Sequence, residues 1–514
     1  MAQISCFSVV SHEMVCQPLA LSFPKSVSRF MTETRINCPT RWCLLVLFAM
    51  LTSTASIHSQ PAGWKPPAIT HPLPPHIRAF VAAQEIEARA LVADLKLEVP
   101  SDFWIYFELA KGGEIAAARD LVIKHEQGSR QNPGGVHAKS LASPVWQTVI
   151  DTAVTFENYG VGGAKYWDAF ARGISSNVTA GAIYFGGTDA GRSLVTAHLK
   201  SHAKGDPFFL VAQNSLTRGP YLDYVNWLFG NRIWLPDAAA LKSAQESYLQ
   251  DAERRLEHDL KFPERPRQIR LGEDVRKVDG KVKASGAVAD MVVNAVLAKM
   301  IFERNPQREF FVEESFPLDW MYPHLSPHGF VLKLNREPLA SLDEETLARD
   351  REFWRAQVKP MIGGWLQPET PVKEVCAFVE RVFADKNLTG FEGDPQFVGD
   401  AASRQSFAKL RCAIAGVYNF RLSSLDGAPP RKEDLAKYQA EYARLQAATD
   451  FAFRQAFALC PSSPEAVFRY INFLSAKGRL NDALLIAKSF LKIDPGNAAA
   501  KGLMEQLEKF NKLK

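Results

Sequence analysis

Residues 186–192, GGTDAGR, form a glycine-containing loop whose side chains could bind a small ligand. Backbone N–H groups at the start of a helix favour an anion, and Arg192 would add positive charge. Asp189 would oppose a phosphate but could accept hydrogen bonds from sugar hydroxyls. The spacing fits neither a Walker A loop nor GxGxxG. The alternative is a glycine turn before a helix capped by Thr188 or Asp189. The candidate ligand-binding residues are Gly187, Thr188, Asp189, Gly191 and Arg192.

A second candidate group combines acidic and aromatic side chains. Its members are Glu313, Glu314, Asp319 and Trp320. Paired carboxylates beside aromatic rings suit carbohydrate binding or acid–base catalysis, since glycosidases place two carboxylates across the scissile bond. The alternative is that Glu313 and Glu314 point to opposite faces of a strand end, while Trp320 fills the core.

Amide and imidazole side chains complete the inventory of candidate groups. Gln213 and Asn214 could contact a polar ligand or cap a loop. His198 and His202 lie four residues apart, as do His324 and His328, and histidines at this spacing on a helix can bind zinc. HExxH is absent from the sequence, and a proline at position 327 disfavours a helix at the second pair. We therefore expect no metal site and no cofactor.

A βαβ unit is needed to position these groups. The apolar runs Ala182–Phe185 and Phe208–Ala212 predict buried strands, and Ser193–His202 predicts the helix between them. Such a unit requires a parallel sheet with both faces covered. The glycine loop and Gln213-Asn214 would then lie side by side at the carboxyl edge, where open α/β sheets bind ligands.

Further strands are predicted at 308–312 and 330–334, while residues 261–283 are expected to form an exposed connection. The predicted fold class is therefore α/β, a small mostly parallel sheet with covering helices. An all-α tetratricopeptide-like region follows it. Its signal is the motif AFALCP, echoed by SFLKIDP with prolines 34 residues apart, around helices predicted at 464–476 and 481–493.

Composition shifts divide the chain into successive segments. From Met31 the sequence resembles a signal peptide, with Arg35 and Arg41 before the apolar core Trp42–Leu51. This pattern predicts an extracytoplasmic protein, with an uncleaved N-terminal anchor as the alternative and membrane contact only through this segment. The predicted segments are a leader at 1–60, a proline-rich linker at 61–75, helical hairpins at 76–144, the α/β domain at 145–340, a helical connection at 341–430 and the repeats at 431–514.

The overall composition is that of a globular protein. The chain has 514 residues, 46% of them hydrophobic and 23% charged, and a net charge of +5. Without a basic run, this weak charge gives no reason to expect a nucleic-acid partner. After the leader, only Cys376, Cys412 and Cys460 remain, which leaves open one disulfide with a free thiol or three reduced cysteines.

Several motifs, in order, resemble the soluble C-terminal region of bacterial membrane proteins of the protein O-mannosyltransferase-like class. They are IYFGGTDAGR, FFLVAQNSL, EESFPLDWMYPHLSPHG with KLNREP, KLRCAIAGVYNFR and AFALCPSSPEAVFRYINFL. The resemblance covers roughly residues 145–510 and implies an extracytoplasmic α/β domain followed by helical repeats. It transfers no catalytic residue, because that chemistry belongs to a multi-span membrane part of such enzymes. Ala190 stands where the resemblance leads us to expect proline.

Three functional hypotheses follow. The first is an exported, non-catalytic accessory module of the cell envelope that recognises a glycan, a glycoprotein or a membrane partner, with a protein partner on the repeats. The second is a carbohydrate-active enzyme that uses Asp189 with the carboxylates of Glu313, Glu314 and Asp319. The third is a purely structural repeat scaffold.

Overall fold

The computed structural model describes residues 71–512, except 133, 203–204 and 428–430. Its described residues form two compact units, one up to Asp350 and one from Arg351 onward. The predicted leader and most of the predicted linker lie outside the described residues. Among the described residues, no helix is both long and apolar enough to cross a membrane.

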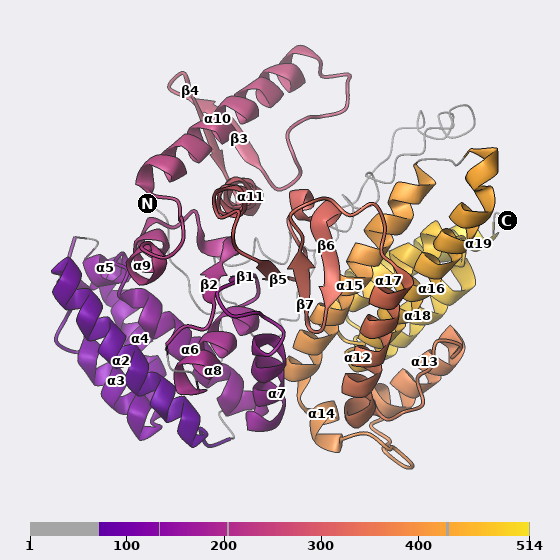
Figure 1. Cartoon of the computed structure of the whole chain (residues 1–514), viewed down its shortest axis with the longest axis horizontal. Coiled ribbons are helices and arrows are strands. Elements are labelled where there is room, and N and C mark those ends of the chain that lie inside the picture. The colour runs from indigo at the N-terminus through magenta and orange to yellow at the C-terminus, as the bar shows by residue number, and fades with distance from the viewer. Residues whose placement is uncertain (1–70, 133, 203–204, 428–430, 513–514) are drawn as a thin grey trace. The chain divides into compact units, whose positions relative to one another are not determined.

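A five-stranded sheet is the centre of the first unit (Figure 1). Its order is β2-β1-β5-β7-β6. β1 pairs in parallel with β2 and with β5, whereas β7 is antiparallel to both β5 and β6. The sheet is thus mixed, which corrects the expectation of a mostly parallel sheet. The strands are β1 (Ile183–Gly186), β2 (Phe209–Ala212), β5 (Phe310–Glu313), β6 (Leu325–His328) and β7 (Val331–Leu334).

Helices cover both faces of the parallel part. β1 and β5 are buried at every position, as strands covered on both sides must be. The connection from β1 to β2 runs one way across the sheet, and that from β2 to β5 runs back past β1. Right-handed crossovers therefore place α8 (Val195–His202) and α11 (Ala287–Arg304) on opposite faces, as Figure 1 shows.

The strand predictions at 182–185, 208–212, 308–312 and 330–334 are confirmed to within one or two residues. β6 was not predicted, because Pro327 was considered only as evidence against a helix at this position. The structure places β6 at the edge of the sheet, where proline is tolerated because its missing N–H leaves no pairing unmet.

The remaining helices of this unit precede the sheet or lie between its strands. α2 packs against α3, α6 and α8, so the predicted hairpins form part of the same unit as the sheet. These helices are α2 (Pro75–Leu95), α3 (Phe103–Gly112), α4 (Ile115–Gln131), α5 (Val136–Leu141), α6 (Trp146–Gly162), α7 (Ala164–Ser175), α9 (Gly219–Phe229) and α10 (Ala238–Lys261).

Residues 261–283 are only partly the exposed connection that the sequence suggests. β3 (Asp274–Val278) and β4 (Lys281–Ser285) form an antiparallel hairpin of largely exposed residues. Its two-residue turn has positive φ at both positions, 52° at Asp279 and 74° at Gly280. Asp-Gly in this conformation is a favoured hairpin connection.

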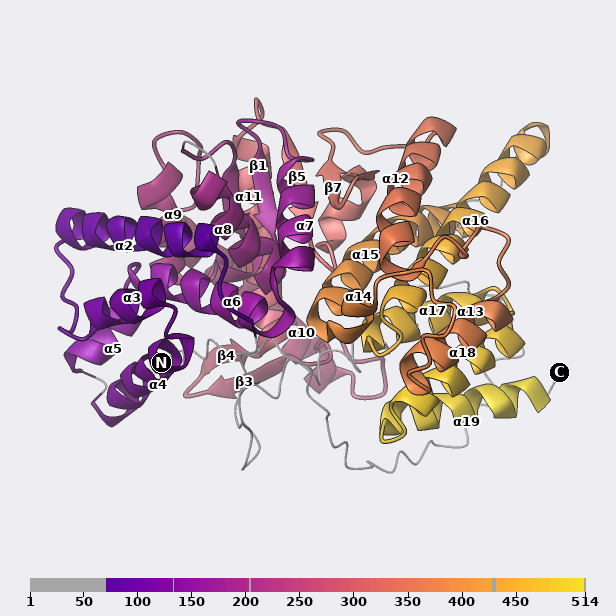
Figure 2. The ribbon, with the colours of Figure 1, turned by 90° about the horizontal axis from the view of Figure 1, so that it is seen from below.

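The second unit is built from helices. α15 packs along α16, and α16, α17, α18 and α19 each contact the next, as Figure 2 shows. This is the arrangement that a helical-repeat region requires, and Gly478, with φ of 73°, occupies the predicted turn between α17 and α18. The elements are α12 (Glu344–Ile362, beginning in the first unit), α13 (Val372–Val379), η5 (Glu380–Ala384), α14 (Pro395–Gly399), α15 (Ala401–Asp426), α16 (Leu435–Leu459), α17 (Pro464–Ala476), α18 (Leu480–Ile493) and α19 (Ala498–Lys512).

A buried polar network joins helices of the second unit. Asp450 on α16 accepts hydrogen bonds from Tyr470 Oη at 2.8 Å and Arg454 Nη2 at 2.9 Å, and its Oδ2 lies 3.0 Å from Arg479 Nη1. One carboxylate thus ties α16 to α17 and to the turn before α18. Cys376, Cys412 and Cys460 are all free and buried, so the structure favours the reduced alternative.

Candidate functional site

The parallel strands bring three separate stretches of the sequence to one edge of the sheet. Gly186, the last residue of β1, is in register with Ala212 of β2 and with Glu313 of β5. The segments that follow these residues therefore emerge together. We call the resulting group the sheet-end site; it consists of Thr188, Asp189, Gln213, Asn214, Glu313 and Glu314.

Glu313 is bound by the glycine loop rather than exposed beside it. The residue is 2% exposed. Thr188 Oγ1 lies 2.9 and 3.1 Å from the two carboxylate oxygens, and Thr188 N donates to Oε2 at 3.2 Å. The same hydroxyl accepts from Gly191 N at 2.9 Å, so Thr188 also caps the helical segment that follows. Asp189, the alternative cap, makes no capping hydrogen bond.

Two glycines make this close packing possible. A Cβ at Gly191 would lie 1.7 Å from Glu313 Oε2, and a Cβ at Gly187 would lie 1.9 Å from Glu314 Oε2. Real Cβ atoms do not approach other heavy atoms this closely. Gly187 and Gly191 thus admit the two carboxylates to the loop, which gives a structural reason for glycine at both positions.

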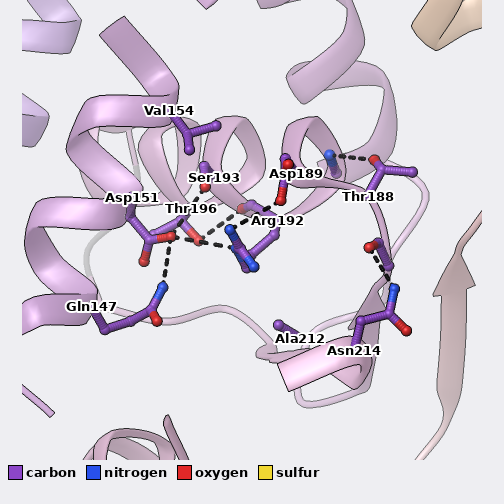
Figure 3. A network of polar contacts seen from close by, with 12 residues as sticks. Gln147, Asp151, Val154, Thr188, Asp189, Arg192, Ser193, Thr196, Ala212 and Asn214 are labelled. Atoms are coloured by element: carbon purple, nitrogen blue, oxygen red, sulfur yellow. Dashed lines mark hydrogen bonds and ion pairs between the residues drawn. The ribbon is translucent and has the colours of Figure 1, made fainter. Parts of the chain in front are cut away.

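Glu314 faces the segment after β2. Its Oε2 accepts hydrogen bonds from Asn214 Nδ2 at 2.8 Å and Gln213 Nε2 at 3.2 Å. Asn214 Nδ2 also donates to the Gly187 carbonyl at 2.9 Å, so the amide does lie beside the glycine loop (Figure 3), as parallel pairing predicts. Gln213 is buried, whereas Asn214 is exposed and Glu314 half-buried. The solvent-facing part of the site is therefore formed by an amide and carboxylates.

Arg192 forms ion pairs with two carboxylates of the protein. Its Nη2 donates to Asp189 Oδ1 at 3.2 Å, and its Nε lies 3.6 Å from Asp151 Oδ1 (Figure 3). The Arg192 side chain is 13% exposed and that of Asp189 43%. The expected positive charge is therefore matched within the protein. A backbone N–H of the loop is also hydrogen-bonded within the protein, since Gly187 N donates to the Glu313 carbonyl at 2.7 Å. The arrangement does not favour an anion.

Asp151 on α6 is a member of this network that the sequence analysis missed. Its Oδ1 also accepts from Gln147 Nε2 and Ser193 Oγ, each at 3.1 Å. Burial raises the pKa of Asp151, while Arg192 acts in the opposite direction. Asp151 is the only charged residue between positions 146 and 156, and this was the available signal, since a buried carboxylate needs a partner.

A cavity adjoins the network on the side of β2. Polar groups on its wall include Asp151, Arg192, Lys200 and Tyr224, among apolar side chains such as Leu210. Lys200 pairs with Glu87, and Tyr224 Oη donates to the same carboxylate at 2.6 Å. The charge of Lys200 is thus compensated from α2, while Asp151 and Arg192 compensate each other.

The other predicted site residues lie outside the sheet-end site or pack against neighbouring side chains. Asp319 is exposed at the start of the 3-10 helix η4 (Asp319–His324). The Trp320 ring lies 5.4 Å from that of Phe302 on α11, which agrees with a packing role. The His198 and His202 rings stack at 4.5 Å, and His328 ends strand β6, so the second histidine pair is not helical, as Pro327 predicts.

Comparisons with protein families, with curated proteins and with solved structures found no match to this chain.

Proposed function

We propose that the protein is a non-catalytic binding module that recognises a hydroxyl-rich ligand, a glycan or a glycoprotein, at the sheet-end site. The observation that carries this proposal is the burial of Glu313 against Thr188. A general acid or base must reach the substrate, and a carboxylate that is 2% exposed inside the loop does not.

The chemistry of the remaining groups supports a neutral polyol over an anion. Asp189, Glu314 and Asn214 carry acceptor oxygens on the solvent side, while the guanidinium of Arg192 is engaged with two carboxylates. Sugar hydroxyls donate hydrogen bonds to such oxygens, and carboxylate acceptors form the stronger bonds. A phosphate at the same place would meet two negative charges.

The test is binding of the full chain to a glycan array, followed by calorimetric titration with each glycan that binds. Asp189→Asn and Glu314→Gln should each weaken binding about tenfold or more, the loss of one charge-assisted hydrogen bond. Glu246→Gln is the matched control, because Glu246 is a 60% exposed residue of α10 that pairs at the surface with Lys242.

Three results would contradict the proposal. One is a chain that binds no glycan on the array, and a second is glycan binding that ignores both site substitutions. The third is turnover of a bound sugar that Glu314→Gln abolishes, which would favour the carbohydrate-active enzyme instead. Circular dichroism of each variant separates lost binding from lost folding.

Location in the cell envelope is part of the same proposal. It depends on the leader-like segment and on the resemblance to the O-mannosyltransferase-like region, and the leader falls outside the described residues. N-terminal sequencing of the mature protein from an envelope fraction tests it. Cleavage after the apolar core Trp42–Leu51 is the expected result, and an intact N-terminus in the cytoplasmic fraction would overturn it.

A further inference from the structure

A second polar cluster lies among the N-terminal helices, within the first unit but in segments that contribute nothing to the sheet. Its members are Asp102, His125 and His137. Asp102 precedes α3, His125 lies near the end of α4 and His137 is in the first turn of α5. Each offers one ligand atom, and these atoms lie within 4.8 Å of one another.

We propose that Asp102, His125 and His137 bind one divalent transition-metal ion, with Zn²⁺ the expected occupant. Two imidazoles and one carboxylate match the ligand types and number that zinc takes from a protein when water fills its fourth position. Imidazole nitrogens disfavour Mg²⁺ and Ca²⁺, which prefer oxygen ligands. The site would tie α5 to the α3–α4 hairpin.

The spacing of the ring nitrogens supports an ion. His125 Nδ1 lies 3.3 Å from His137 Nδ1. Two ligands of a tetrahedral zinc with Zn–N bonds of 2.0–2.1 Å are separated by roughly 3.3–3.4 Å. Gly128 on α4 permits this approach, because a Cβ there would lie 3.1 Å from His137 Cδ2.

Burial of His125 is an independent observation. The residue is 2% exposed, and its two ring nitrogens face the other two members of the cluster, Nδ1 at 3.3 Å from His137 Nδ1 and Nε2 at 3.1 Å from Asp102 Oδ1.

The surrounding charges permit a cation. Asp102 supplies one negative charge, and Lys124 Nζ lies 3.1 Å from its Oδ2. The Lys124 side chain is 67% exposed, so its ammonium can move into solvent when a metal binds. Asp102 makes no capping hydrogen bond to α3, which leaves its carboxylate available to the cluster.

The test is titration of the chelator-treated full chain with Zn²⁺ by calorimetry, and with Co²⁺ by visible absorption. Four N-terminal cysteines are replaced by serine in every protein compared, so that thiolates outside the cluster do not contribute. These are Cys6, Cys16, Cys38 and Cys43. We expect one equivalent of metal per chain, a rise in Tm with Zn²⁺, and d–d absorption bands of a cobalt site without thiolate ligands.

His137→Gln and Asp102→Asn are the test substitutions, because these residues are half-buried and can change without opening the core. Each should weaken zinc binding by at least about tenfold. His202→Gln is the matched control: its ring belongs to a different histidine group, 4.5 Å from His198 and 5.2 Å from His76.

The proposal is overturned if the parent chain binds no Zn²⁺ at micromolar concentrations, which would leave a hydrogen-bonded Asp–His–His chain. It is also overturned if His202→Gln abolishes binding while His137→Gln does not, since the ion would then belong to the other histidine group. Circular dichroism and Tm of the metal-free variants confirm that each protein is folded.

Discussion

The two units bury charged side chains in different ways. In the first unit, Glu313 is enclosed by a loop whose Thr188 lies 125 residues earlier, and its donors include a hydroxyl and a backbone N–H. In the second unit, Asp450 is enclosed by arginines and a tyrosine within 29 positions of it along the helices. The first arrangement depends on strand register and on glycine, while the second depends on ion pairs between neighbouring helices.

The difference shows where a ligand site can form. Strands that end in register gather polar groups from distant parts of the sequence and leave some of them facing solvent. In a network between helices such as that around Asp450, the polar groups pair with one another and are not available to a ligand. This contrast is the reason for placing ligand recognition at the sheet end, and each prediction below tests one side of it.

The largest expected effect is in the helical unit. Asp450→Asn removes the charge that two guanidinium groups share, and breaking a buried ion pair costs about 3 kcal/mol. The free energy of unfolding in urea should fall by this amount. Asp434→Asn is the control, because Asp434 pairs at the surface with the 79% exposed Arg431 and should cost less than about 1 kcal/mol. Equal effects of the two substitutions would mean that the buried network is not stabilising.

The second prediction concerns the sheet end. Gly191→Ala would place a Cβ 1.7 Å from Glu313 Oε2, in a side chain that burial and Thr188 hold in place. Overpacking of this kind costs about 2 kcal/mol in unfolding free energy. Gly219→Ala is the control, since a Cβ there meets nothing within 4 Å. An unchanged urea midpoint for Gly191→Ala would show that Glu313 leaves the loop easily. Glu313 could then act as a general acid or base, as the hypothesis of a carbohydrate-active enzyme requires.

Local patterns in the sequence were enough to predict much of the sheet end. Short apolar runs predict β1 and β2, and the parallel pairing of such runs places Asn214 beside the glycine loop. The β3–β4 hairpin had an available signal in Asp279-Gly280, but its strands are charged and exposed, so hydrophobic alternation did not reveal them.

Other features depend on tertiary structure and could not be predicted from spacing. Asp151 reaches Arg192 only because α6 packs on the segment after the loop. His125 and His137 lie 12 positions apart on separate helices, a spacing that fits no zinc motif, and they meet because α4 and α5 pack together. The antiparallel pairing of β7 with β5 likewise joins separate parts of the chain, whereas β6 pairs with β7 locally through a two-residue turn.

A third prediction uses pH to distinguish the two units. The sequence contains no histidine after His328, so histidine titration affects the first unit and not the residues from Arg351 onward. Burial, together with the nearby His202 and Arg172, lowers the pKa of His198 to about 4. Since the unfolded chain protonates near pH 6.5, the contribution of His198 is complete above that pH and is lost as pH falls toward 4. After allowance for its half-exposed ring, the loss is about 1–2 kcal/mol.

This loss should be measured as the difference between the parent chain and His198→Gln in urea unfolding at pH 7, 5.5 and 4. Because glutamine does not titrate, the stability of the parent relative to the variant should fall by about 1–2 kcal/mol between pH 7 and pH 4. Parallel pH profiles would show that His198 is protonated as easily in the folded unit as in the unfolded chain. Asp450→Asn should leave the difference unchanged, since its unit carries no histidine.

The smallest effect is expected where a glycine of the helical unit repeats the crowding seen at Gly191. A Cβ at Gly416 would lie 2.0 Å from Arg469 Nη2. That atom is the end of a flexible arginine side chain, whose Nη1 lies 3.3 Å from Glu465 Oε1, so the guanidinium can shift within this ion pair more easily than a carboxylate enclosed by a loop. Alanine also favours the middle of α15 over glycine by about 1 kcal/mol. Gly416→Ala should therefore change the unfolding free energy by less than about 1 kcal/mol, despite a contact almost as short as that at Gly191. If its cost instead matches that of Gly191→Ala, Arg469 is held as firmly as Glu313, and side-chain rigidity does not distinguish the two units.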